Sequence, residues 1–218
     1  MLARFFMLCI LFLFLPCESE AAKRLETGNT ITPKVEIFLE RGTIFQTTGK
    51  LDQAIIEYSK AIEIDAEEAY AYANRGGVYF LVERYQEAIE DLNKAIQLNP
   101  KLDIAYFNKG LVYSHLGDYQ QAIEGFNQYI LLNPNDFMAY YLRAYGYLKL
   151  GQHQKSVNDF SQSIHINPKY ADAYNDRGIT YLLMKQNQLG CTDLQKACDY
   201  GVCIGLDTAQ KMGECELK

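Results

Sequence analysis

The chain of 218 residues contains no tryptophan, only three histidines and no run of lysine or arginine. None of the three, His115, His153 and His165, has a histidine partner at the four-residue spacing typical of helical metal sites. There is no glycine-rich phosphate loop and no Gly-x-Ser-x-Gly turn. The formal net charge of −6 argues against nucleic acid, which requires a clustered basic surface. We therefore predict no catalytic residue, no metal and no cofactor, and keep an exported enzyme as an alternative.

The first 21 residues differ in composition from the rest. One positive charge precedes an unbroken apolar run at 5–15, and proline and small residues follow. This is the plan of a secretory signal peptide, which we predict over residues 1–21 with cleavage after Ala21. The run is shorter than the ~20 residues that a membrane span needs. Lipid attachment at Cys17 and an uncleaved anchor are the alternatives, and they are the only membrane links that we expect.

Several residue types recur along the chain in steps of 34. The Asn-Pro dipeptide does so at 99–100, 133–134 and 167–168. Two tyrosine columns keep the same step, one formed by Tyr72, Tyr106, Tyr140 and Tyr174 and the other by Tyr79, Tyr113, Tyr147 and Tyr181. Separate columns in one register indicate a structural repeat.

This period and these columns resemble the tetratricopeptide repeat family. The second unit shows the family pattern as Tyr72, Gly76, Tyr79, Ala88, Leu92, Ala95 and Pro100. The resemblance implies an all-α fold, a right-handed superhelical solenoid of five helix-turn-helix hairpins closed by a C-terminal capping helix. The expected boundaries are a polar lead at 22–34, repeats at 35–68, 69–102, 103–136, 137–170 and 171–203 (the last divergent), and a disulfide-stapled cap and tail at 204–218.

The spacing of apolar residues supports helical hairpins independently. In the third unit Ile104, Phe107 and Leu111 fall on one helix face, and a second apolar stretch follows after a turn. Proline cannot continue a helix, so each Asn-Pro marks the end of a hairpin. One hairpin cannot bury both of its faces, and stacking on the next unit buries the second.

The mature chain keeps four cysteines, all near its C-terminal end. Cys191 and Cys198 share a predicted helix, where seven residues separate them by ~10 Å, too far for a disulfide. In an antiparallel hairpin centred on Gly201, Cys198 faces Cys203 and Cys191 faces Cys215, and we predict these two bridges. A four-cysteine zinc site is the alternative, although no Cys-x-x-Cys pair is present.

By resemblance, the first helices of the repeats line a concave groove that binds peptides. The expected groove residues are Tyr70, Asn74, Ile104, Phe107, Asn108, Leu111, Met138, Tyr141 and Tyr145. In the family an asparagine at the sixth repeat position binds the ligand backbone; Asn74 and Asn108 match it, and Asp176 matches it in part. The alternative is that the aromatic side chains pack on neighbouring helices. Arg75, Lys109, Arg143 and Arg177 form a further column, which we expect to be solvated or paired with acidic residues.

The predicted function is a non-catalytic scaffold that binds a peptide or protein segment, with no nucleic-acid partner. The second repeat position lacks Lys and Arg, so an apolar or aromatic ligand fits better than a carboxylate tail. An assembly or self-associating part of an envelope complex, using edge or convex surfaces, is the alternative. The signal segment predicts export to the periplasm or beyond, and anchoring in the envelope is the alternative.

Overall fold

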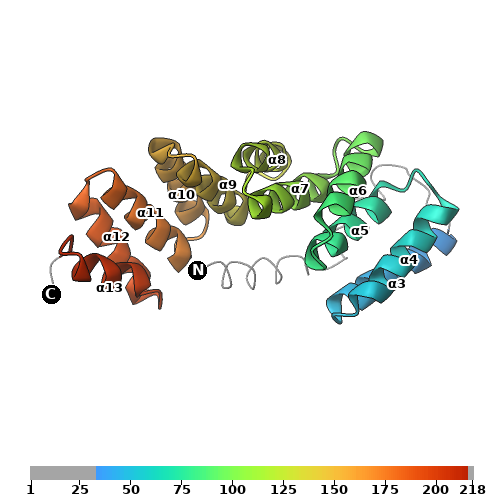
Figure 1. The fold of residues 1–218 in the computed structure, drawn as a ribbon, viewed down its shortest axis with the longest axis horizontal. Helices are drawn as coiled ribbons and strands as arrows, with labels where there is room; N and C mark the ends of the chain where they lie inside the picture. Colours follow the sequence, from blue (N-terminus) through green and yellow to red (C-terminus); the bar gives the residue numbers. More distant parts are fainter. Residues whose placement is uncertain (1–32, 216–218) are drawn as a thin grey trace. The chain divides into compact units, whose positions relative to one another are not determined.

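The structure, a computed structural model, describes residues 33–215, and within this range it consists of helices without strands (Figure 1). The helices are α3 (Pro33–Thr47), α4 (Leu51–Ile64), α5 (Ala69–Leu81), α6 (Tyr85–Leu98), α7 (Asp103–Leu116), α8 (Tyr119–Leu132), α9 (Phe137–Lys149), α10 (His153–Ile166), α11 (Ala171–Leu183), α12 (Asn187–Asp199) and α13 (Ile204–Lys211). Consecutive helices pair as hairpins, which confirms the all-α repeat fold.

The chain divides within α7, between Asn108 and Lys109, into two compact units. In the first, α3 packs on α4 and α5 on α6, and α4 also packs on α5 (Figure 1). The junction is an apolar cluster in which Val35 and Tyr58 of the first hairpin meet Ala71 and Val78 of the second. Every one of these four side chains is fully buried.

The second unit repeats this packing, with α9 on α10, α11 on α12, and contacts from α8 to α9 and from α10 to α11. Small residues allow the close approach of paired helices. A Cβ placed on Gly110 would lie 2.7 Å from the ring of Phe126, and one on Gly178 would lie 2.9 Å from Leu194. A larger side chain at either glycine would force the hairpin apart.

The turn inside each described hairpin uses one left-handed residue at the same repeat position. Gly49, Gly117 and Gly151 have φ between 69° and 81°, a region that glycine adopts without steric cost. Glu83 and Lys185 occupy this position in the second and fifth hairpins with φ of 62° and 61°. The turn geometry is therefore common to the repeats and is kept even where a side chain makes it unfavourable.

The Asn-Pro dipeptides end the second helices. Asn99, Asn133 and Asn167 are the C-cap residues of α6, α8 and α10, and each donates its backbone N–H to a carbonyl in the last turn. The Asn99 side chain also accepts a hydrogen bond from the backbone N–H of Lys101. This local turn explains why the dipeptide recurs at the hairpin boundaries.

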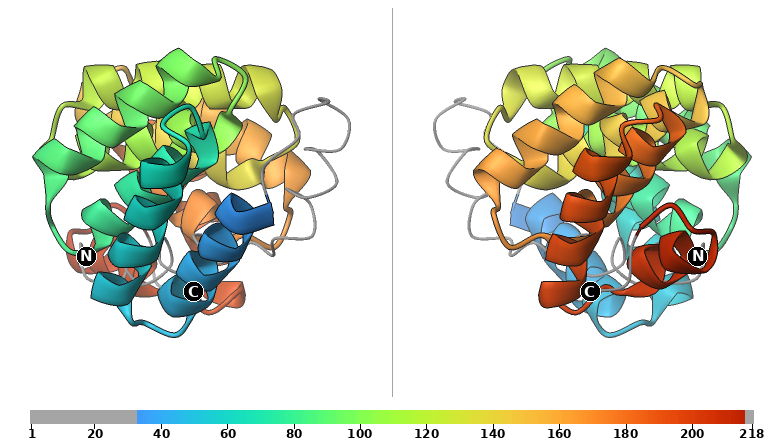
Figure 2. Two further views of the ribbon diagram at one scale, coloured as in Figure 1. Left: turned by 90° about the vertical axis from the view of Figure 1, so that its right-hand side faces the viewer. Right: turned by 90° about the vertical axis from the view of Figure 1, so that its left-hand side faces the viewer.

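The C-terminal end is closed by α13, which lies against α11 and α12 (Figure 2). Leu206 and Ala209 of α13 pack on Leu182 and Leu194. Two disulfides hold the segment, Cys191–Cys215 and Cys198–Cys203, with Cα–Cα distances of 5.6 and 4.0 Å. These are the pairs that the hairpin argument predicts, and they leave no thiolate set for the alternative zinc site.

The predicted signal peptide at 1–21 and most of the polar lead at 22–34 lie outside the described residues. Helix α3 already begins at Pro33, inside the predicted lead. From 33 to 215, every helix is too short or too polar to cross a membrane.

Candidate functional site

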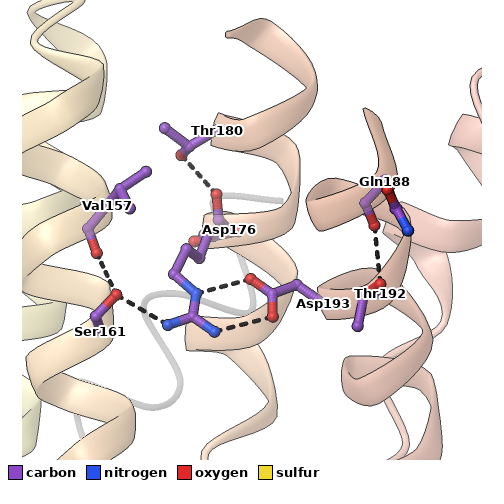
Figure 3. A network of polar contacts seen from close by, with 8 residues as sticks. Val157, Ser161, Asp176, Thr180, Gln188, Thr192 and Asp193 are labelled. Carbon is purple, nitrogen blue, oxygen red and sulfur yellow. Dashed lines mark hydrogen bonds and ion pairs between the residues drawn. The ribbon is translucent and has the colours of Figure 1, made fainter. Parts of the chain in front are cut away.

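The arginine column is structural. Arg75, Arg143 and Arg177 each form a two-pronged ion pair with the carboxylate 16 residues later, in Asp91, Asp159 and Asp193 respectively, with Nε–O distances of 2.6–2.7 Å. A third N–H of each guanidinium reaches the preceding hairpin, at Ser59, Asn127 and Ser161. Figure 3 shows Ser161 and Asp193, the two residues that accept hydrogen bonds from Arg177. In these three repeats the arginine therefore ties its hairpin to the one before it, and the arginines are only 17–18% exposed.

The third repeat departs from this arrangement. Lys109 occupies the arginine position, and the residue 16 positions later is Gly125, which has no carboxylate. The Lys109 ammonium lies 5.9 Å from the centre of the Tyr113 ring. Lys109 therefore differs from the arginines, with which the sequence analysis groups it, because no carboxylate stands 16 residues later in this repeat.

In the first unit, the expected groove residues differ in exposure. Tyr70 and Asn74 on α5 and Ile104 on α7 are partly exposed, whereas Phe107 and Asn108 are 6% and 3% exposed. Asn108 packs against α5, since its Nδ2 lies 3.0 Å from where a Cβ on residue 77 would stand, and residue 77 is glycine. The side-chain Oδ1 of Asn108 is buried and has no hydrogen-bond partner.

In the second unit, Leu111, Met138 and Tyr141 are buried and Tyr145 is partly exposed. The Tyr141 ring lies 5.0 Å from that of Tyr170 and 5.6 Å from that of Phe160, measured between centroids. This arrangement matches the alternative in which an aromatic side chain packs on neighbouring helices.

The polar end of Tyr141 meets a carboxylate on α11. Its hydroxyl donates to Oδ2 of Asp176 at 2.8 Å, and the Asn175 amide donates to Oδ1 at 2.9 Å. Burial raises the pKa of Asp176 above its ordinary 3.8, although both hydrogen bonds and Lys149 act in the opposite direction. Burial likewise raises the pKa of Tyr141 well above 10.0, and Asp176 adds to the shift. Asp176 occupies the sixth repeat position, so the partial match in sequence corresponds to a largely buried acid.

No group of three or more His, Cys, Asp or Glu residues that could hold a metal occurs among residues 33–215. The ring nitrogen Nδ1 of His153 is buried and has no hydrogen-bond partner. The four cysteines of this range are joined in disulfides.

The comparison with protein families decides the family. Residues 69–102 and 104–136 match the family described as "Tetratricopeptide repeat", and residues 42–82 and 144–185 match "TPR repeat". The chain belongs to the tetratricopeptide repeat family. Proteins with this repeat are typically non-catalytic scaffolds that bind protein or peptide partners.

Solved structures share the fold of this tetratricopeptide repeat protein. A MamA structure is 24% identical with a TM-score of 0.70, covering 85% of this chain and 98% of its own. MamA 41-end from Desulfovibrio magneticus RS-1 is 16% identical with a TM-score of 0.73, over 78% and 97% of the two chains. YrrB, described as "a TPR protein with an unusual peptide-binding site", is 24% identical with a TM-score of 0.71, over 79% and 90%. A search of curated proteins gives no match.

Proposed function

We propose that this chain is a non-catalytic scaffold that binds a peptide or protein segment along the first helices of its repeats. The proposal rests on the observation that the Oδ1 atom of Asn108 is buried and accepts no hydrogen bond. A buried unpaired acceptor costs about 1–3 kcal/mol. A ligand backbone N–H that reaches this oxygen would remove that cost, and the gain would appear as affinity.

The position of Asn108 supports the same proposal. It follows Asn74 by one repeat step of 34 residues, so the same amide recurs at the sixth position of two successive repeats. An amide both donates and accepts, which suits the alternating N–H and C=O groups of a peptide backbone. YrrB shares the fold and has a peptide-binding site, so the scaffold is compatible with this task.

The ligand that fits is apolar or aromatic. The second repeat position, where carboxylate-binding members carry basic residues, holds Glu36, Tyr70, Ile104 and Met138. Tyr70 and Ile104 of the first unit are partly exposed, and so is Tyr145 of the second, so each unit has side chains that can contact an apolar ligand. Phe107 and Tyr141 are buried and would shape the surface from beneath.

We place the protein in an oxidising compartment outside the cytoplasm. Two disulfides join all four cysteines between residues 33 and 215, and such bridges persist where thiols are not kept reduced. The signal-like residues 1–21 support export to the periplasm or beyond.

The test is selection of peptides from a random library on the purified protein, followed by calorimetric titration. Asn108→Ala should weaken binding of selected peptides about tenfold or more, as the loss of one buried hydrogen bond would. Asn158→Ala is the matched control, because it removes an exposed amide from the second helix α10. Equal affinity of wild type and Asn108→Ala would contradict the groove proposal and favour edge or convex surfaces. Turnover in a broad hydrolase screen would favour the enzyme alternative.

A further inference from the structure

The third and tenth positions of each repeat distinguish the first repeat from all the others. At the third position Ala71, Ala105, Ala139 and Ala173 are 0% exposed. At the tenth, Val78, Val112 and Thr180 are 0% exposed and Gly146 is buried. The first repeat carries Ile37 and Ile44 at these two positions, 52% and 58% exposed.

The first unit shows what normally covers these positions. Ala71 and Val78 of α5 lie in one cluster with Val35, Leu39 and Tyr58 of the preceding hairpin. Ile37 and Ile44 lie one heptad apart on α3 and therefore on one side of that helix, which we call the N-terminal face. Within the described residues no helix precedes α3, so no hairpin covers this face.

The chemistry of the N-terminal face is not that of a solvated end. Terminal repeats normally present a polar outer surface, because they have no neighbour. Here the two positions carry larger aliphatic side chains than any later repeat does. Ile37 and Ile44 are adjacent on the helix surface and more than half exposed, so we interpret them as one apolar surface for a partner.

Side-chain size narrows the choice of partner. Alanine occupies the third position at every later junction, so a regular preceding hairpin leaves no room for isoleucine there. Two faces that each bear protruding isoleucines can interdigitate instead. Once the predicted signal peptide at 1–21 is removed, residues 22–32 carry only Leu25 and Ile31 as large aliphatic residues, which makes them a poor cover.

We propose that two copies of this chain pair through their N-terminal faces, burying Ile37 and Ile44 of each. The opposite end cannot serve, because α13 covers α11 and α12 and the Cys191–Cys215 disulfide holds it there. Pairing of two identical faces closes after two copies, so a dimer forms rather than a fibre. The face is small, and the dimer is accordingly weak, with a dissociation constant in the micromolar range (~1–100 μM). This inference is independent of peptide binding.

The experiment is sedimentation velocity on the protein purified from the cell that exports it, with its N terminus read by mass spectrometry. Wild type should shift from monomer to dimer over this concentration range. The double variant Ile37→Glu/Ile44→Glu should raise the dimer dissociation constant at least ~10-fold. Leu131→Glu/Leu183→Glu is the matched control, because both leucines are exposed, at 74% and 55%, and belong to the second unit. Helix content and thermal unfolding should be unchanged in both variants, since no buried side chain is altered.

Three outcomes would overturn the proposal. The first is a wild-type monomer at every concentration, as expected if the chain's own leader or another protein covers the face. The second is a dimer that survives the isoleucine double variant. The third is equal loss of the dimer in the leucine control, which would indicate a general effect of added negative charge.

Discussion

The two ends of this repeat array finish in opposite ways. At the C-terminal end, a short helix packs on the last hairpin and a disulfide spanning 24 residues fixes it. At the N-terminal end, the first helix exposes Ile37 and Ile44 where later repeats bury small residues. The two ends of the array are therefore closed differently. Substitutions at the same repeat position near each end can measure how much this difference contributes to the free energy of unfolding.

The seventh repeat position should show the largest contrast. Arg177→Ala removes the two-pronged partner of Asp193, whose side chain is 10% exposed, and breaks the link to Ser161. An unpaired buried carboxylate costs about 3–4 kcal/mol in the free energy of unfolding, which chemical denaturation measures.

Arg41→Ala is the matched change in the first repeat. Arg41 is 53% exposed and has no preceding hairpin to reach within the described residues, and Glu57 keeps an ion pair with Lys60 at 2.6 Å. We expect a cost below ~1 kcal/mol. Equal losses at the two arginines would show that the link between hairpins contributes nothing beyond a surface ion pair.

Removal of the covalent staple comes next in size. Cys191→Ser/Cys215→Ser opens the longer loop and should cost ~3 kcal/mol, whereas Cys198→Ser/Cys203→Ser opens a five-residue separation and should cost ~2 kcal/mol. Hydrogen exchange by mass spectrometry should show faster exchange in α13 and α12 for the first variant, with α3 to α6 unchanged. Retained protection in α13 would mean that the packing of Leu206 and Ala209 alone closes this end.

The fold could be predicted from sequence because its signals are local and repeated. The left-handed turn and the Asn-Pro boundary are set by backbone geometry, so they recur in register whatever else changes. The cysteine pairing followed from one turn at Gly201. The Arg–Asp link was only half visible: the arginine column is plain, but its partner 16 residues on is interrupted by Gly125.

The candidate site was less predictable for a physical reason. Whether Tyr141 presents its ring or packs it depends on Tyr170, Phe160 and Asp176, which lie on other helices. The unpaired oxygen of Asn108 depends on the close approach of Gly77. The exposed isoleucines, in contrast, could have been found from sequence by comparing the third and tenth positions across repeats.

The smallest contrast concerns the sixth position, where the last repeat has Asp176 and the first has the exposed Glu40. Because burial raises the pKa of Asp176 in the folded chain, the protonated form favours folding. The free energy of unfolding should therefore increase as pH falls through the raised pKa toward 3.8, and decrease again as pH rises. Asp176→Asn keeps an acceptor for Asn175 and a partner for Tyr141, so it should abolish this contribution and stabilise the protein slightly at neutral pH. Denaturation curves across this acid range compare Asp176→Asn with wild type. A pH profile that is identical in wild type and Asp176→Asn would mean that the carboxylate is solvated well enough to ionise normally, and that the two ends differ only in packing and covalent closure.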